Sequence, residues 1–584
     1  MIEMLNFSKK NYSKIDSIVI LVKIAVFIFV AVYLFGNFTP FYEGNDSYTL
    51  ATIAMKISNG EYIDTNELLE KTSRSEFIPG DWAKTLDEKH AFPLGPVGFH
   101  FFTAFFYVLG NNYALFYLGP IFGILFLFFS ERVATKLFNS NVGLLTLLFL
   151  ATNHLFYRSA IHLNVDVIFS LFFVVGSYFF IKFLKEPNQT KIFIASIFFV
   201  FATLMRVNGV IVFPIEIIIF LLYFIINRNS IKKFKFKHIQ LPTKKLYLFG
   251  LFMVIPWIIF FGFYFGYNQI FFDDPLTNYA IQQRGYENTD AKFTSLFLIG
   301  DKHFENFKQY SKYLLPYQFP AMESSLFNQF NSILGTFWLG IASLIMLFST
   351  LILSLKLKQH RIPLIVFTLF IFGILWFFAS VTSEERAIDG VPGRYVMPAF
   401  TLFFMVIGYL LVTTFQESYK LIKSKAWMGK SYRFLLISFV AIFFICSFFF
   451  IPPTEKIKSN SFEFKNPQDY NQAHPPNVEG LTEDSVIVSI KTDRVLEYDV
   501  IPFHILPLDR GGSQDSIVLL KEIILDDYNT FIFKEPTTIQ EKPLLSYLVK
   551  EHNFVLKNYS ESFCKISISE NTQKEISDVE CLLN

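Results

Sequence analysis

Acidic residues and arginines lie next to the ends of long apolar runs at several places in the chain. Asp46 follows the first run, Arg158 and Asp166 stand in "NHLFYRSAIHLNVDVIFSLFFV", Arg206 ends another run, and Arg394 precedes "YVMPAF". A carboxylate near the lipid headgroups can accept a proton from a hydroxyl, and burial there raises its pKa toward a useful range. An arginine guanidinium binds phosphate oxygens in two places. These residues therefore suit proton transfer and phosphate binding if the fold brings them together.

The composition indicates a membrane protein. The chain has 584 residues, of which 52% are hydrophobic, 17% are charged and 76 are Phe. A soluble chain of this length would need more charge to cover its surface. Apolar segments of about membrane-spanning length fall at 17–35, 94–110, 113–130, 142–157, 164–184, 190–206, 208–227, 246–266, 332–355, 362–380, 395–415 and 433–451. The net charge of +2 predicts no nucleic-acid partner.

Lys and Arg in short loops favour the cytoplasm and so predict the orientation of these segments. The richest basic loops are 228–245, 356–361 and 417–433, with lesser ones at 131–141 and 182–191. All of them, and the N-terminus, can lie on one side only if one early segment does not cross the membrane. Segment 94–110 is short and is interrupted at its start by Gly and Pro, which predicts an interfacial or re-entrant helix.

The predicted fold is a polytopic α-helical membrane protein with eleven crossings, a cytoplasmic N-terminus and an external C-terminus. Residues 1–451 form the membrane domain in this prediction. Its outer loops are 36–112 with interfacial helices, 158–163, 206–208, 267–331 and 381–394.

The tail, residues 452–584, changes in composition. Strand-length apolar runs at 485–490, 530–535 and 564–569 alternate with helix-like stretches at 516–528 and 542–553. This alternation predicts a small extracytoplasmic α/β domain. The sequence assigns it no ligand.

The order of these features resembles the GT-C superfamily of integral-membrane glycosyltransferases, in the branch of protein O-mannosyltransferases and aminoarabinose transferases. That branch has an acidic residue early in a long first outer loop, a Pro-rich helix start, an Arg-to-Asp stretch after the third helix and a late "RYxxP" motif. The matching positions here are Asp46, Pro93 to Val97, Arg158 to Asp166, and Arg394-Tyr395 with Pro398. Two features depart from the family: Asp46 follows Asn45 instead of a second acid, and the double Pro is "FPLGP".

The resemblance implies transfer of a hexose or pentose from a polyprenyl-phosphate donor, which stays in membrane lipid, to an acceptor at the outer face. Asp46 would act as the base, and Asp166 would orient the acceptor or Asp46. Arg394, with Arg158 or Arg206, would bind the lipid phosphate. Whether the acceptor is a protein, a lipid or a glycan is not specified by these residues.

The resemblance also places three further residues at the substrate. Tyr395, beside Arg394 in the late motif, is a candidate substrate-binding residue. Lys89 and His90 lie where related enzymes have donor-contacting or metal-binding residues, so a bound divalent metal ion stays an open question and no other cofactor is expected.

Structural interpretations exist for the same residues. Asp46 suits a solvated loop, Asp166 suits a helix start favoured by the dipole, and the arginines suit interfacial anchors. Glu216 lies inside an apolar segment, where a charge is costly and usually has a role, but the sequence names no partner for it.

A transporter or lipid flippase is the main alternative function, and a scaffold without catalytic activity is another. Transporters usually place charges and broken helices near the midplane within repeated halves. Here the charges gather at one predicted face and no matching halves are evident.

The predicted orientation can be tested by cysteine labelling. A single cysteine placed within 228–245 should be shielded from a membrane-impermeant thiol reagent in intact cells, whereas one within 381–394 should be labelled. Permeabilised cells provide the control, because both cysteines should then react. The reverse pattern in intact cells would contradict the orientation.

Overall fold

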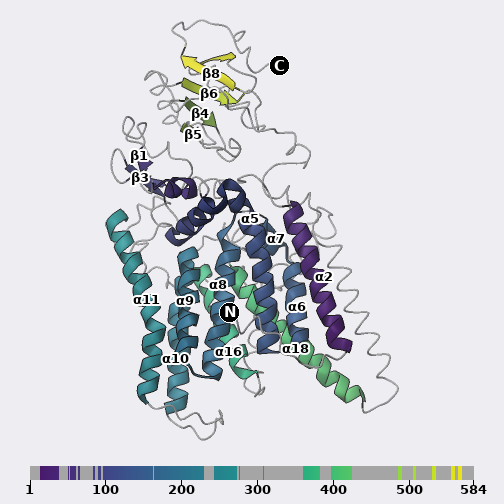
Figure 1. Cartoon of the computed structure of the whole chain (residues 1–584). Coiled ribbons are helices and arrows are strands. Elements are labelled where there is room, and N and C mark those ends of the chain that lie inside the picture. Colours follow the sequence, from purple (N-terminus) through teal and green to yellow (C-terminus); the bar gives the residue numbers. More distant parts are fainter. Residues whose placement is uncertain are drawn as a thin grey trace. The chain divides into compact units, whose positions relative to one another are not determined.

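The fold was analysed in a computed structural model (Figure 1). It describes residues 14–37, 50, 53–60, 64–65, 83–85, 90–93, 96–161, 163–228, 243–272, 275, 307, 360–381, 396–423, 485–489, 504–507, 529–533, 554–558 and 563–568. The chain divides into two compact units. The first, here called the helical unit, comprises Met1–Phe38, Tyr117–Asn278 and Tyr286–Ile457, and the second comprises Thr39–Phe116, Tyr279–Gly285 and Lys458–Asn584.

Long apolar helices make up the described part of the helical unit. They are α2 (Lys14–Asn37), the C-terminal part of α5 (Val97–Leu137), α6 (Ser140–Ala151), α7 (His154–Ala160), α8 (Val165–Lys185), α9 (Gln189–Met205), the short 3₁₀ helix η2 (Val207–Ile211), α10 (Val212–Arg228), α11 (Thr243–Phe272), α16 (Arg361–Val381) and α18 (Met397–Lys423). Five described helices are long and apolar enough to cross a membrane: Ser17–Gly36, Tyr113–Leu137, Val165–Lys185, Tyr247–Phe271 and Arg361–Phe378.

The helices follow the predicted apolar segments with two refinements. Segment 142–157 was expected to be one helix, but it divides into α6 and α7 because Thr152 and Asn153 leave the helical path between them. Segments 94–110 and 113–130 are separated, as predicted, by non-helical backbone at Gly110 and Asn111 within α5. Segments 332–355 and 433–451 lie outside the described residues, so the prediction of eleven crossings remains untested.

Asparagine caps start four successive helices of the unit. The side-chain oxygens of Asn139, Asn153, Asn164 and Asn188 accept backbone N–H groups at the starts of α6, α7, α8 and α9, at distances from 2.8 to 3.1 Å. Asparagine is among the preferred N-cap residues because its short side chain satisfies a first-turn N–H group that has no partner within the helix. The loops therefore define where these helices begin.

Helix α8 lies at the centre of the unit and contacts α7, α9, α16 and α18 (Figure 1). Rings from three helices meet in its core. The ring centroid of Phe173 in α8 lies 5.8 Å from that of Phe199 in α9 and 5.3 Å from that of Phe370 in α16, and the latter two rings are 5.5 Å apart. Gly176 permits this approach, since a Cβ there would come within 2.7 Å of the Phe199 ring.

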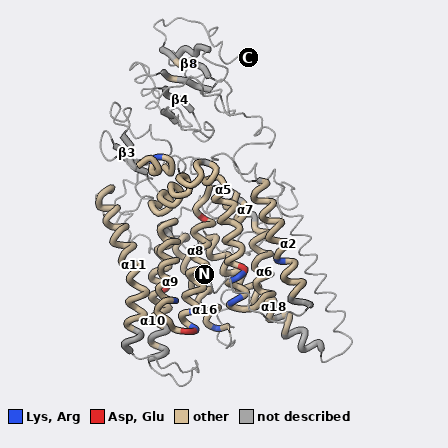
Figure 2. Tube along the Cα trace, in the orientation of Figure 1, with Lys and Arg blue, Asp and Glu red and all other residues tan. Residues whose placement is uncertain are grey.

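Contacts between helix ends define one end of the helical unit. Tyr33, near the end of α2, contacts Tyr157 in α7 with ring centroids 4.7 Å apart. Phe404 in the first part of α18 lies 5.6 Å from Phe149 near the end of α6. Thus α2 and α6 finish where α8 and α18 begin, and we call this the site end. In Figure 2 most Lys and Arg of the described helices lie toward the opposite end.

The described strands belong to the second unit. Strands β1 (Asp64–Thr65), β2 (Ala83–Thr85) and β3 (His90–Pro93) form an antiparallel sheet in the order β1-β3-β2. Strands β4 (Ser485–Ser489), β5 (His504–Pro507), β6 (Asn529–Phe533), β7 (Phe554–Asn558) and β8 (Phe563–Ile568) form a mixed sheet in the order β5-β4-β6-β8-β7. The predicted strands 485–490, 530–535 and 564–569 coincide with β4, β6 and β8, while the predicted tail helices lie outside the described residues.

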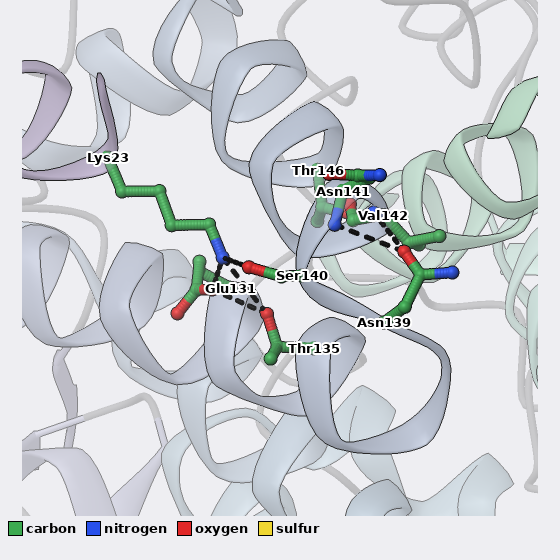
Figure 3. A network of polar contacts seen from close by, with 8 residues as sticks. All are labelled: Lys23, Glu131, Thr135, Asn139, Ser140, Asn141, Val142 and Thr146. Atoms are coloured by element: carbon green, nitrogen blue, oxygen red, sulfur yellow. Dashed lines mark hydrogen bonds and ion pairs between the residues drawn. The ribbon is translucent and has the colours of Figure 1, made fainter. Parts of the chain in front are cut away.

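A buried polar network links α2 to α5 and α6 (Figure 3). The Lys23 ammonium donates to Glu131 Oε1 at 2.5 Å, to Ser140 Oγ at 2.9 Å and to Thr135 Oγ1 at 3.2 Å. Thr135 also donates to Glu131 Oε1 at 2.6 Å. The absence of a side chain at Gly143 leaves room for this network, because a Cβ there would overlap Thr135 Oγ1 and lie 3.0 Å from the Glu131 carbonyl oxygen.

Gly143→Ala should therefore lower the free energy of unfolding by about 2 kcal/mol, because the added methyl forces the hydroxyl of Thr135 away from Glu131. Gly262→Ala in α11 is the matched control, since its Cβ would meet no atom within 4 Å and alanine favours a helix by up to about 1 kcal/mol. The measurement is denaturant-induced unfolding in mixed micelles. Equal stability of the two variants would contradict the steric argument.

Candidate active site

Asp166 occupies the first turn of α8 at the site end. The Asn164 side chain caps this turn by accepting the Asp166 backbone N–H at 2.8 Å. A carboxylate is favoured here by the partial positive charge of the helix N-terminus. The residue is nevertheless fully buried. A buried carboxylate requires a compensating cation or strong hydrogen-bond donors.

Arg206 supplies the cation. It caps the C-terminus of α9, where its backbone N–H bonds to the Ala202 carbonyl at 2.9 Å, and the helix end favours positive charge. Its Nη1 donates to Asp166 Oδ1, forming an ion pair that joins residues 40 positions apart. The pair thus lies where the N-terminus of α8 meets the C-terminus of α9.

The corner after Arg206 is closely packed. Gly209 in η2 donates its N–H to the Arg206 carbonyl at 2.8 Å. A Cβ on Gly209 would come within 2.9 Å of the Thr203 Cα atom and 3.1 Å of the Phe169 ring. Since both neighbours belong to the helices that carry the pair, the turn holds Arg206 close to the α8 N-terminus.

The ion pair adds a contact that the sequence did not predict. Asp166 was expected to orient the acceptor or Asp46, and Arg206 was one of two arginines expected to bind the phosphate together with Arg394. The structure brings these two residues together, so Asp166 acts directly on the position of Arg206.

The remaining predicted site residues have no described side chains. Asp46, Lys89, Arg394 and Tyr395 lie outside the described residues. The backbone of Arg158 belongs to α7, and that of His90 belongs to β3, where it is paired with Thr65. Their roles therefore remain predictions.

The chain order relates two of these residues to described helices. The chain leaves α2 at Asn37, nine positions before Asp46. Arg394 precedes α18, which begins at Met397. Asp46 thus follows a helix that ends at the site end, and Arg394 precedes a helix that begins there.

Two further buried carboxylates lie within the helices. The Glu216 carboxyl in α10 accepts the Ser196 hydroxyl from α9 at 2.8 Å and the Trp257 indole N–H from α11 at 2.9 Å. Sequence analysis noted Glu216 but named no partner, because hydrogen bonds between helices depend on packing. The other is Glu131 in the Lys23 network, which was not predicted, although Lys23 stands inside the apolar run 17–35 and was a visible signal.

Within the described ranges, no group of three or more His, Cys, Asp or Glu side chains is placed to hold a metal ion. The predicted candidate His90 has no described side chain. Whether the chain binds a divalent metal ion therefore depends on residues outside those ranges.

Residues 90–260 match the protein-family model described as dolichyl-phosphate-mannose-protein mannosyltransferase. The matched segment includes the Pro-rich start of α5 and both members of the Asp166–Arg206 pair. This match confirms the predicted resemblance to GT-C membrane glycosyltransferases. Together with the apolar helices, it supports a multi-pass location in the membrane. No curated protein matches the chain.

Solved structures to which the chain is similar include ArnT from Cupriavidus metallidurans bound to undecaprenyl phosphate. It is 12% identical with a TM-score of 0.49, and the alignment covers 94% of this chain and 98% of that one. AglB from Archaeoglobus fulgidus, in complex with an inhibitory peptide and a dolichol-phosphate, is 11% identical with a TM-score of 0.41, covering 94% of this chain and 74% of that one.

The coupling between Asp166 and Arg206 can be measured with a double-mutant cycle. Asp166→Asn and Arg206→Gln should each lower the free energy of unfolding by about 3–5 kcal/mol, because each leaves its partner buried without its counter-ion. The double variant should lose less than the sum, with a coupling of about 1 kcal/mol or more.

The exposed ion pair between Glu186 and Lys191 (2.7 Å) is the matched control, since it joins the connection between the same two helices at their opposite end. Removal of either partner should cost less than about 1 kcal/mol. Additive losses at Asp166 and Arg206 would show that the two side chains act independently.

Proposed function

We propose that this chain transfers a sugar from a polyprenyl-phosphate donor to a hydroxyl-bearing acceptor at the outer membrane face. The observation that carries the proposal is the family match across residues 90–260, which includes the buried Asp166–Arg206 pair. The family description names a dolichyl-phosphate-linked mannose as donor and a protein as acceptor. The sugar and the acceptor used by this chain are left open in the proposal.

In the proposed reaction, the acceptor oxygen attacks C1 of the sugar. Asp46 takes the hydroxyl proton as the new C1–O bond forms. The bond from C1 to the phosphate oxygen breaks, and its electron pair leaves with the polyprenyl phosphate. An aspartate suits this role, because its carboxylate can accept the hydroxyl proton as the new bond forms.

Arg206 is the proposed holder of the leaving phosphate, and Asp166 is its positioning residue. The leaving group retains its negative charge, and a planar guanidinium matches phosphate oxygens with two parallel N–H bonds. A long arginine side chain loses rotamer freedom when it binds. The bond from Nη1 to Asp166 reduces that loss in advance, so that the guanidinium is oriented before the donor arrives.

Arg394 and Arg158 are proposed to complete the phosphate site, with Tyr395 beside them and Lys89 and His90 at the donor sugar. These positions follow from the family motifs and from the convergence of helix ends at the site end. The proposed division assigns the proton transfer to the segment after α2 and the phosphate to arginines in or next to helix ends.

The proposal can be tested with purified protein in detergent. The donors are undecaprenyl-phosphate hexoses and pentoses, and the acceptors are peptides, lipids and glycans. The assay measures the release of undecaprenyl phosphate. Asp46→Asn should lower turnover by a factor of about 10²–10⁴ with little change in donor affinity, because it removes the base only. Glu186→Gln, at the exposed α8–α9 connection, is the control for loss of a carboxylate and should have the turnover of the wild type.

Equal turnover by Asp46→Asn and the wild type would remove Asp46 from the mechanism. Solute uptake without sugar transfer would favour a transporter.

A further inference from the structure

We propose that Lys182 and Lys185 at the end of α8, with Arg361 at the start of α16, bind the anionic headgroup of a membrane phospholipid. The two lysines lie three positions apart in the last turn of α8, and their charges repel each other. Arg361 is the first residue of α16, which packs against α8. We call these three residues the basic cluster.

The lysines of the basic cluster lack a close counter-ion in the part of the chain that the structure describes. Glu186 attracts both of them, but it is exposed and forms its ion pair with Lys191, at 2.7 Å. Neither Lys182 nor Lys185 forms an ion pair with a described carboxylate. The Lys182 ammonium instead lies 6.0 Å from the centre of the Tyr178 ring. Both lysines are only partly exposed, so water does not fully replace the missing partner.

Helix dipoles do not balance these charges. The C-terminus of α8 carries the equivalent of about half a negative charge, and the N-terminus of α16 carries about half a positive one. The two ends lie close together, because the charge of Lys185 acts on His360, the residue before α16. The first turn of α16 contains no acidic residue. The cluster therefore keeps an excess of positive charge, which favours an anionic ligand.

The lengths of the two helices place the basic cluster at the depth of lipid headgroups. The candidate membrane spans are Val165–Lys185 in α8 and Arg361–Phe378 in α16, so Lys185 and Arg361 each stand at the end of an apolar segment. Lipid phosphates lie at this boundary, and basic residues between transmembrane helices there bind anionic headgroups. We therefore assign an anionic phospholipid, rather than a soluble phosphate, as the ligand.

The basic cluster is separate from the proposed donor site. Asp166 and Lys185 are 19 positions apart in one helix, which corresponds to about 28 Å and is close to the thickness of the hydrocarbon core. A lipid at the cluster therefore lies in the leaflet opposite to the Asp166–Arg206 pair. Loss of sugar transfer would leave lipid binding intact, and absence of lipid binding would leave the proposed reaction intact.

Native mass spectrometry of the full-length protein tests the lipid preference. The protein is released from micelles that contain phosphatidylglycerol and phosphatidylcholine with the same acyl chains. The wild type should retain phosphatidylglycerol at least about tenfold more strongly, because only this lipid has a net negative charge. Equal retention of the two lipids would overturn the proposal. Displacement of phosphatidylglycerol by millimolar inorganic phosphate would also overturn it, because the cluster would then be a general anion site.

Single variants test which charges bind the headgroup. Lys182→Gln and Lys185→Gln should each weaken phosphatidylglycerol binding about fivefold, because each removes one positive charge. Lys185→Arg keeps the charge and should retain the binding. Lys191→Gln is the matched control at the same α8–α9 connection and should change the binding less than about twofold, because Lys191 is already paired with Glu186. Equal losses in all three glutamine variants would indicate a diffuse charge effect and overturn the assigned site. If a variant does not fold, the lipid preference of the wild type decides.

His360 supplies a second measurement beside the cluster. Burial lowers the pKa of its ring, the contact of its Nδ1 with the Leu137 carbonyl at 3.1 Å opposes this effect, and the charge of Lys185 lowers the pKa further. An anion bound at Lys185 offsets that charge. The pKa of His360 should therefore be higher in phosphatidylglycerol nanodiscs than in phosphatidylcholine nanodiscs.

The pKa is measured from the ¹⁵N chemical shifts of labelled histidine, with His360 assigned by the loss of its signals in His360→Gln. The difference between the two lipids should become smaller in Lys185→Gln, because this variant loses the bound headgroup. Equal pKa values in the two lipids would contradict lipid binding at the cluster. A difference that persists in full in Lys185→Gln would reflect only the surface potential of the anionic membrane and would equally overturn the proposal.

Discussion

A charge within the apolar helices is tolerated only where the fold provides its partner, and this constraint determines how the helices are arranged. The three buried carboxylates of the described helices satisfy it in different ways: Asp166 with an arginine, Glu131 with a lysine and a hydroxyl, and Glu216 with a hydroxyl and an indole. Removing water from a carboxylate costs several kcal/mol even after relaxation. Packings that separate these partners are therefore disfavoured far more strongly than packings that merely loosen an apolar contact.

The partners are distant in the sequence, so each network fixes a different part of the helical unit. Lys23 and Glu131 are 108 positions apart and hold α2, whose face is otherwise largely exposed and apolar, at one height against α5. Glu216 links three helices, since its partners Ser196 and Trp257 lie in α9 and α11. The phenylalanine contacts around α8 supply much of the buried area, but rings of similar size pack in several registers. Directional polar bonds specify one register among them.

The sequence predicted the helices better than the site because the two depend on different physics. Apolar length defines a membrane helix locally, and the described helices fall on the predicted segments with shifts of a few residues. The break between α6 and α7 was missed because apolar residues continue on both sides, and only the capping geometry of Asn153 reveals a new helix start. Asp166 and Arg206 were both selected as site residues from their positions at segment ends. Their direct pairing was not predicted, because it depends on how α8 packs against α9.

The location of the Asp166–Arg206 pair distinguishes it from the other two networks. Glu131 and Glu216 lie within helices, where polar networks act chiefly by fixing how the helices pack against one another. Asp166 and Arg206 lie at helix ends, where the dipoles of α8 and α9 already favour their charges. The two helix ends therefore favour each charge on its own. The ion pair in addition orients the Arg206 side chain and neutralises both charges. An arginine held in this way keeps its charge and gains a fixed direction. Recognition of a phosphate at a membrane surface requires both properties.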